Sequence, residues 1–252
     1  MVSVPPVPTW EGPPPLGVVV DLDDTLYPQA EYLAGAALAV GRVAGELGLD
    51  GDAVGAALAA CLAAGSDTGG TIDGALLAVG TAEADLPRFV PPLVAAFTGH
   101  EPERLTPYPG VAAALRSLSR AAPLGCLTDG NPAIQAAKLA AVGLPELADV
   151  VVTDVLGGRA FRKPHPAGLT TLAGRMGVPV DRLLVIGDRP GKDVAVAAAV
   201  GARAIRIRQG EYADVPDVPR AWAVVDSFPE AAELALSVLS RVPVKAAGHP
   251  NG

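Results

Sequence analysis

One stretch of the sequence decides the fold, and it reads Val18-Val19-Val20-Asp21-Leu22-Asp23-Asp24-Thr25-Leu26-Tyr27-Pro28. The apolar run from Leu16 to Val20 predicts a buried strand, and it ends in three carboxylates within four residues. Because burying so much negative charge without a counter-charge is costly, we expect a cation there. Mg²⁺ is the natural candidate, since it takes oxygen ligands and needs few protein carboxylates. The alternative is an Asp-rich turn that only caps a helix.

Strands and helices alternate through the second half of the chain. This pattern predicts an α/β fold with a doubly wound parallel sheet. The strands are expected at 16–22, 123–128, 150–152, 183–186, 204–207 and 223–225, and the intervening helices at 111–120, 132–142, 166–176 and 193–200.

Helical spacing dominates the segment between the first strand and the rest of the predicted sheet. A first helix is expected from Pro28 to Gly48 and a second from a cap at Asp52 to Gly65. A third is expected around 72–79, and a fourth after Pro91-Pro92 up to about Thr98. Four such helices in series predict a small helical bundle inserted directly after the carboxylate loop.

The predicted domain organisation has four parts. They are a flexible Pro-rich arm at 1–15, a catalytic core made of 16–28 and 106–240, a helical cap at 29–105 and a flexible tail at 241–252. The cap contains a loop at 65–71 that could reach the carboxylates and touch a substrate. A plain flexible connector is the simpler interpretation of this Gly-rich loop.

Composition excludes some classes of protein. The formal net charge of −8 over 252 residues argues against a nucleic-acid-binding protein, which would need a basic face. No apolar run reaches the length of about 18–20 residues needed to cross a membrane, and the first basic residue is Arg42, so a basic signal-peptide start is not expected. Cys61 and Cys126 lack metal-binding spacing and are expected to be buried, reduced thiols. These features predict a cytoplasmic protein of undetermined oligomeric state.

Polar residues follow the predicted strands at four places. After the carboxylate stretch come Thr128-Asp129-Gly130-Asn131, Arg162-Lys163-Pro164 and Gly187-Asp188-Arg189-Pro190-Gly191-Lys192-Asp193. Because the carboxyl ends of parallel strands share one edge, we expect these residues to converge. A metal site, a hydroxyl, a cation and Gly-rich turns together suit phosphoryl transfer. Singly, Thr128 could end a strand, Lys163 could be a solvated charge, and Asp188 or Asp193 could cap a helix.

The order and spacing of these four motifs resemble the haloacid dehalogenase-like hydrolase superfamily, in the branch with a helical cap after the first motif. The resemblance covers about residues 16–230 and implies a Rossmann-like core. It implies that Asp21 is the nucleophile and forms an aspartyl-phosphate. It also implies that Asp23 protonates the leaving oxygen and then activates water.

The resemblance assigns the remaining roles to the other motifs. Thr128 and Lys163 would hold the phosphoryl oxygens, joined by backbone N–H groups near Leu22 and Asp129. Asp188 would ligate Mg²⁺ together with Asp21 and the backbone carbonyl of Asp23. Asp193 would orient the waters of the metal or Lys163.

The acid at position 23 favours phosphate esters over carbon–halogen bonds, because the dehalogenases of the superfamily lack it. The leading hypothesis is a Mg²⁺-dependent phosphatase that hydrolyses a small phosphorylated metabolite, such as a nucleotide or sugar phosphate. The alternatives are a phosphomutase of the β-phosphoglucomutase type and a non-catalytic binding protein on the same fold. One departure from the family pattern is the segment 157–162 before Lys163, which is longer than usual. Arg162 could contact an anionic substrate or simply lie at the surface.

Overall fold

The computed structural model describes residues 9–239 and contains a six-stranded parallel sheet in the order β3-β2-β1-β4-β5-β6. The predicted doubly wound α/β fold is therefore confirmed. The strands are β1 (Gly17–Val20), β2 (Leu124–Thr128), β3 (Asp149–Val152), β4 (Leu183–Gly187), β5 (Arg203–Ile207) and β6 (Ala223–Val225).

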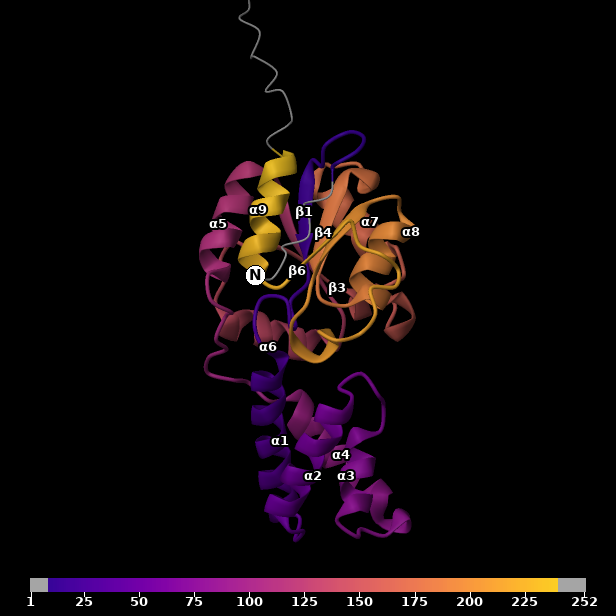
Figure 1. The fold of residues 1–252 in the computed structure, drawn as a ribbon. Helices are drawn as coiled ribbons and strands as arrows, with labels where there is room; N and C mark the ends of the chain where they lie inside the picture. Colours follow the sequence, from indigo (N-terminus) through magenta and orange to yellow (C-terminus); the bar gives the residue numbers. More distant parts are fainter. Residues whose placement is uncertain (1–8, 240–252) are drawn as a thin grey trace, which may run out of the picture.

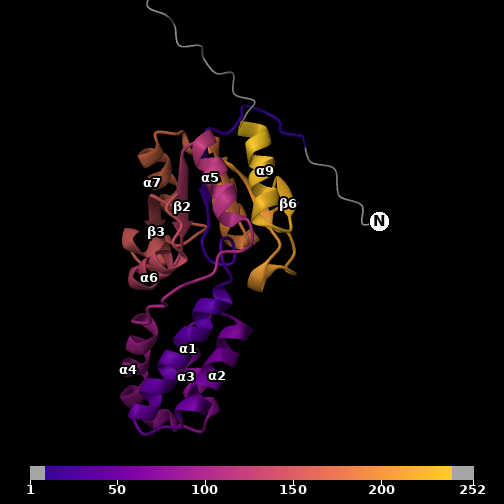
Figure 2. The same ribbon diagram turned by 90° about the vertical axis from the view of Figure 1, so that its left-hand side faces the viewer.

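Helices pack against both faces of the sheet, as Figures 1 and 2 show. Side chains alternate along a strand, so Val18 and Val20 belong to one apolar cluster and Val19 to another. The first cluster includes residues of α5 (Val111–Ala121), α6 (Pro132–Val142) and α9 (Phe228–Leu239); the second includes residues of α7 (Ala167–Met176) and α8 (Ala195–Ala199). The sequence analysis missed α9, although Phe228, Ala231, Ala235 and Val238 recur at helical spacing and are buried.

The strand order creates a switch point between β1 and β4. The chain builds outward from β1 through β2 to β3, then returns to place β4 on the other side of β1. Val20 pairs with Ile186, so the two strands end side by side. In open parallel sheets ligands bind at such a point, and the loops that follow β1 and β4 carry Asp21 and Asp188.

Four helices between β1 and β2 form a bundle with its own apolar core, which extends from one end of the sheet in Figure 1. They are α1 (Gln29–Glu46), α2 (Gly51–Ala64), α3 (Thr71–Ala78) and α4 (Leu86–Thr98). Helices α1 and α2 approach closely because glycines line their contact: a Cβ at Gly41 would lie 2.6 Å from the carbonyl oxygen of Gly51.

Two predicted helix starts in the bundle are wrong. Asp50, rather than Asp52, caps α2, since its carboxylate accepts the backbone N–H of Ala53 at 3.1 Å. Helix α4 begins at Leu86 and runs through Pro91-Pro92 instead of starting after them. Proline costs a helix its backbone hydrogen bonds, but Phe89 and Leu93 are buried in the core of the bundle, and this packing holds the helix together.

The N-terminal segment contacts the core where it is described. The Trp10 ring lies 4.8 Å from the Trp222 ring, and Arg182 donates to the carbonyl oxygen of Pro14 at 2.8 Å. Residues 9–15 of the predicted flexible arm are therefore held against the sheet domain, because an aromatic pair and arginine donors anchor them. Residues 1–8 of the predicted arm, and the predicted tail at 241–252, lie outside the described residues.

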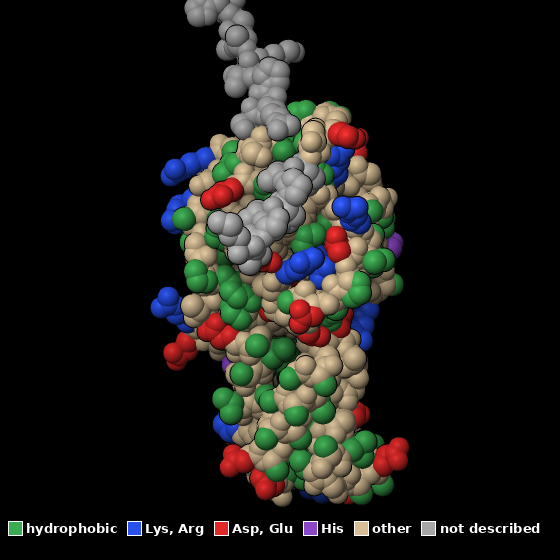
Figure 3. Space-filling view, in the orientation of Figure 1, with side chains coloured by type: hydrophobic (Ala, Val, Ile, Leu, Met, Phe, Trp, Pro, Cys, Tyr) green, Lys and Arg blue, Asp and Glu red, His purple; other side chains and the backbone are tan. Residues whose placement is uncertain are grey.

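The surface charge, the length of the helices and the state of the cysteines also bear on the predictions from the sequence. On the face shown in Figure 3, Lys and Arg side chains are interspersed with Asp and Glu and do not form one basic surface. Between residues 9 and 239, every helix is too short or too polar to span a bilayer. Both cysteines are free; Cys126 is buried as predicted, whereas Cys61 is only partly buried.

Candidate active site

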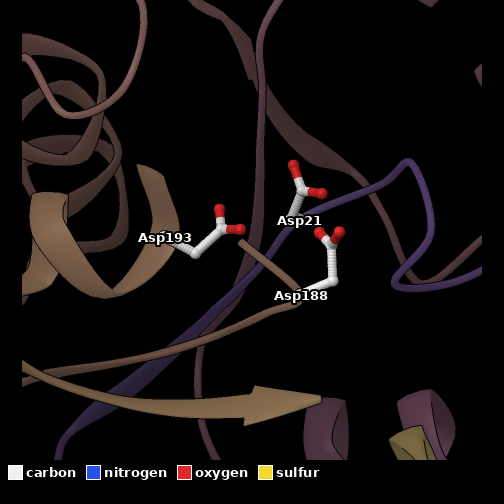
Figure 4. A group of neighbouring side chains, drawn as sticks. All are labelled: Asp21, Asp188 and Asp193. Atoms are coloured by element: carbon white, nitrogen blue, oxygen red, sulfur yellow. The ribbon is translucent and has the colours of Figure 1, made fainter. Parts of the chain in front are cut away.

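Three buried carboxylates meet at the switch point of the sheet. Asp21 follows β1, Asp188 follows β4, and Asp193 lies in a short π-helical turn, Pro190–Val194. One oxygen of each carboxylate lies within 4.8 Å of one oxygen of the other two. Figure 4 shows the three side chains turned toward one another. The two acidic motifs, 167 residues apart in sequence from Asp21 to Asp188, thus form one cluster.

The cluster fits a divalent cation. Both carboxylate oxygens of Asp188 are buried and have no hydrogen-bond partner within the described part of the chain. Burial and the neighbouring carboxylates of Asp193 and Asp21 raise the pKa of Asp188 well above its usual range. Unpartnered buried carboxylate oxygens are costly in water-free surroundings, and they are the ligand type that Mg²⁺ prefers. Asp21 and Asp188 could therefore hold the metal.

Lys163 supplies a buried positive charge to this cluster. Its Nζ lies 2.5 Å from Oδ1 of Asp21 and 2.7 Å from Oδ1 of Asp193, and it donates to the carbonyl oxygen of Leu127 at 3.2 Å. Burial raises the pKa of Asp21 to about 7, against the opposing effect of the Lys163 charge. Asp193 also accepts the backbone N–H of Arg189 at 3.0 Å, which orients its carboxylate toward Lys163. Lys163 is therefore not a solvated surface charge.

Thr128 ends β2 and Asp129 follows it, and both line the pocket with Asp21. The Thr128 hydroxyl is buried and accepts a hydrogen bond from Nε2 of Gln135 at 3.0 Å. Oδ1 of Asp129 accepts the Thr153 hydroxyl at 2.9 Å and the backbone N–H of Lys163 at 3.0 Å. Asp129 thereby connects the end of β2 to the segment that carries the lysine.

Leu22 follows Asp21 directly, and its side chain is fully buried in the core. Its carbonyl oxygen accepts the N–H of Leu26 at 3.0 Å, which closes the loop after β1. Asp24 adopts a left-handed conformation with φ of 53°, and its carboxylate accepts backbone N–H groups of Gln29 at 2.9 Å and Glu211 at 3.2 Å. The three acidic residues of the opening motif therefore differ in position: Asp24 holds the loop in place, while Asp21 and Asp23 line the pocket.

Sequence reasoning missed the residues that surround Asp23. Oδ1 of Asp23 accepts the Tyr27 hydroxyl at 2.5 Å and lies 2.7 Å from Nζ of Lys138, while Oδ2 accepts Nε2 of Gln135 at 3.1 Å. Burial alone would raise the pKa of Asp23, but the Lys138 charge and these hydrogen bonds lower it below its usual value. The available signal was the spacing of Gln135 and Lys138, three apart on the helix after Thr128, which puts them on one face.

The loop between α2 and α3 reaches the core. Oδ2 of Asp67 lies 2.8 Å from Nη2 of Arg189 and 2.7 Å from Nζ of Lys192, and the Ser66 hydroxyl donates to Glu211 at 2.5 Å. The interpretation of 65–71 as a plain connector is therefore wrong, because charged partners on the sheet domain hold it. Arg162 is likewise engaged, with two 2.7 Å hydrogen bonds to Asp154.

A pocket of about 230 Å³ lies between the sheet domain and the bundle. It is lined from the core by residues that include Asp21, Asp23, Thr128, Lys163 and Asp188, and from the bundle by Tyr32, Leu33, Ser66, Asp67 and Phe97. Ligand pockets for drug-sized molecules occupy about 300–1,000 Å³, so this one suits a small metabolite. A larger hollow of about 890 Å³ lies along α1 and α2, but its lining is mainly Ala, Gly and Leu and holds none of the catalytic candidates.

Comparison with known proteins identifies the family of the chain. Residues 16–201 match the family model described as haloacid dehalogenase-like hydrolase. The chain is 31% identical over 205 residues to a glyceraldehyde 3-phosphate phosphatase of Methanopyrus kandleri, covering 79% of this chain and 86% of the relative. It is also 37% identical over 123 residues to a phosphoglycolate phosphatase of Rhodospirillum rubrum, covering 48% of this chain and 49% of that protein.

Solved structures show the same fold. A predicted phosphoglycolate phosphatase from Haemophilus somnus superposes with a TM-score of 0.65 at 18% identity, covering 86% of this chain and 96% of that one. A putative β-phosphoglucomutase from Thermotoga maritima gives a TM-score of 0.62 at 19% identity, covering 90% and 100%. The family model spans most of the chain and a relative at 31% identity covers most of it, so the protein belongs to the haloacid dehalogenase-like hydrolases.

Proposed function

We propose that the protein is a Mg²⁺-dependent phosphatase that hydrolyses a small phosphate monoester through an aspartyl-phosphate intermediate. The observation that carries the proposal is the meeting of Asp21, the unpartnered carboxylate of Asp188 and the ammonium of Lys163 in one pocket. The relatives named above as phosphatases act on phosphorylated compounds of three carbons or fewer, by their names, and the pocket volume suits that size.

The first step is assigned to Asp21. One oxygen of its carboxylate attacks phosphorus, the bond between phosphorus and the ester oxygen breaks, and Asp23 gives its proton to that oxygen. Lys163 and Thr128 hold the phosphoryl oxygens and balance the charge that develops on them. Bound Mg²⁺ would be held by Asp21, Asp188 and the carbonyl oxygen of Asp23, and would neutralise phosphoryl charge.

The second step returns the enzyme to its starting state. Asp23 removes a proton from water, the water oxygen attacks phosphorus, and the bond to the Asp21 carboxylate breaks to release inorganic phosphate. We further propose that the bundle, within residues 29–105, acts as a cap that excludes bulk water during the first step. Support for the cap role comes from the Asp67 and Ser66 contacts, which join the bundle to the wall of the pocket.

The test is hydrolysis of p-nitrophenyl phosphate by the full chain, with Mg²⁺ and with EDTA. We expect activity that needs Mg²⁺ and is abolished by Asp21→Asn. Asp52→Asn, which makes the same chemical change at an exposed position on α2, serves as the matched control. Mass spectrometry of acid-quenched enzyme should detect a phosphoryl group on Asp21. Activity that persists in Asp21→Asn would overturn the proposal, and isomerisation of sugar phosphates faster than phosphate release would indicate the mutase instead.

A further inference from the structure

One guanidinium in the wall of the pocket has no partner within residues 9–239. The lining includes six Lys and Arg side chains, and five of them pair with a carboxylate. The pairs are Lys138 with Asp23, Arg162 with Asp154, Lys163 with Asp21 and Asp193, Arg189 with Asp67, and Lys192 with Asp67 and Asp129. The side chain of Arg159 forms no ion pair or hydrogen bond with any residue between 9 and 239.

The backbone that carries Arg159 is well anchored. Arg159 begins a 3₁₀ turn, Arg159–Phe161, in the segment that is longer than the family pattern. Its neighbour Arg162 is tied to Asp154 by two hydrogen bonds, and a Cβ at Gly157 would lie 2.4 Å from the Phe161 ring, so this turn packs tightly on itself. The position of Arg159 at the pocket is therefore set by the core fold.

The loop between α2 and α3 at residues 65–70, called here the cap loop, lies beside this arginine. A Cβ at Gly69 would lie 3.9 Å from Nη1 of Arg159, so the guanidinium lies beside the loop that also brings Asp67 to the core. Arg159 is exposed to solvent, and it lines the pocket where the bundle and the sheet domain meet.

The same wall has more positive than negative charge. Arg189 and Lys192 share a single oxygen of Asp67, and the Arg189 guanidinium stacks on the Tyr212 ring at 3.9 Å. Lys192 also lies 3.2 Å from Oδ2 of Asp129, so these two cations share two carboxylates, and Arg159 adds a third positive charge to the pocket lining. An anionic group that entered beside Asp67 would find Arg159 free to receive it.

We propose that Arg159 binds a carboxylate of the substrate, so that the enzyme acts on small phosphorylated carboxylic acids. This inference rests on the proposed phosphatase function. A planar guanidinium matches a carboxylate with two parallel hydrogen bonds. The volume of about 230 Å³ leaves room for a phosphoryl group and a short carbon chain, and it is small for a nucleotide.

The test compares two esters that share one skeleton, 3-phosphoglycerate and glyceraldehyde 3-phosphate, which differ only in having a carboxylate or an aldehyde at carbon 1. Phosphoglycolate serves as a shorter carboxylate substrate. We expect the wild type to have at least a tenfold higher kcat/KM for the carboxylates. We expect Arg159→Met to reduce that ratio by about 10- to 100-fold, the range for a lost hydrogen bond to a charged group. Arg159→Lys should restore part of it, because it keeps the charge.

Arg116→Met is the matched control, since Arg116 is exposed on α5 and remote from the pocket lining. The same ratio in wild type and Arg159→Met would overturn the inference, as would a wild-type preference for the aldehyde. In either case, hydrolysis of both esters would leave the phosphatase function standing. If neither ester nor p-nitrophenyl phosphate is hydrolysed, the phosphatase function itself fails and the inference fails with it.

Discussion

Lys138 holds its ammonium nitrogen 2.7 Å from Oδ1 of Asp23, across 115 residues of sequence. The lysine is 4% exposed, and its charge also lies 4.7 Å from the centre of the Tyr32 ring in the bundle. Helix α6 of the sheet domain, the loop that follows β1 and helix α1 of the bundle therefore meet at this one ammonium group.

Replacing Lys138 should raise the pKa of Asp23, because the ammonium lowers it, and should leave the Asp23 carboxylate poorly positioned for the proton transfers assigned to it. We expect Lys138→Met to lower kcat about 10- to 100-fold on an alkyl phosphate, whose leaving oxygen needs a proton. The loss on p-nitrophenyl phosphate should be smaller, because nitrophenolate leaves without one. Steady-state kinetics on the two esters check this difference, with Arg116→Met as the control. An equal loss on both esters would contradict a role through Asp23.

Removing the partner of Lys163 should destabilise the fold. In Asp193→Asn, a buried ammonium keeps only Asp21 as an ionised partner. Breaking a buried pair by removing one partner costs about 3–5 kcal/mol, and we expect about 2–3 kcal/mol because Asp21 remains. Urea unfolding of the wild type and Asp193→Asn in Mg²⁺-containing buffer measures this loss in the free energy of unfolding. Glu46→Gln removes an exposed pair with Arg42 and should change the free energy of unfolding by less than about 0.5 kcal/mol. Equal effects of the two substitutions would refute the prediction.

Metal binding should appear as a gain in stability that depends on Asp188. Mg²⁺ at about 100 times its Kd should stabilise the wild type by about 2.7 kcal/mol. In EDTA, Asp188→Asn should be more stable than the wild type, because it removes one of the clustered carboxylates that oppose folding. Thermal unfolding with and without Mg²⁺ tests both statements. A Mg²⁺ shift of the same size in both proteins would place the metal elsewhere.

The contact between the cap loop and the core should weaken only in acid. Burial by itself would raise the pKa of Asp67 above its ordinary value of 3.8. The hydrogen bond and charge of Lys192, together with the charge of Arg189, instead lower that pKa to about 2. A folded-state pKa below the unfolded value means that the stabilisation is complete above about pH 4 and is lost as the pH falls through 2. Because the Asp67 carboxylate is partly exposed, the contribution is about 1 kcal/mol or less.

The measurement for Asp67 is urea unfolding of the wild type and Asp67→Asn from pH 3 to pH 7. The difference between their free energies of unfolding should be constant above about pH 4 and should fall to roughly half at pH 3. A difference that stays constant down to pH 3, or that grows toward acid, would show that the Asp67 pairing does not stabilise the fold.

Much of the core and of the site could be predicted because both follow local rules. Apolar runs such as 16–20 form buried strands, and residues directly after parallel strands must lie at one edge of the sheet. Asp21, Thr128 and Asp188 occupy such positions, so the structure brings them together where the sequence analysis expected them. Their catalytic roles stay predictions until the variants are measured.

Local rules failed where a contact depends on the packing of distant elements. Pro91-Pro92 resembles a helix start, yet burial of Phe89 and Leu93 in the bundle holds one helix through both prolines. In the same way, the sequence around Asp67 is typical of a flexible loop. Its ion pairs with Arg189 and Lys192, which are distant in the sequence, hold it in place.

The sequence by itself determined the sheet, its parallel sense and the set of carboxylates at its edge, because strand period and strand-end position are local properties of a chain. Only the tertiary structure decided which charges surround them. Tyr27 lies only four residues from Asp23, but the other two partners of Asp23 lie 112 and 115 residues away, on a helix face that is set by packing. The Arg159 guanidinium, which has no partner within residues 9–239, can be recognised only when the other pairs around the pocket are known. A charge pair depends on distance in space, and that distance exists only once the bundle and the sheet have packed together.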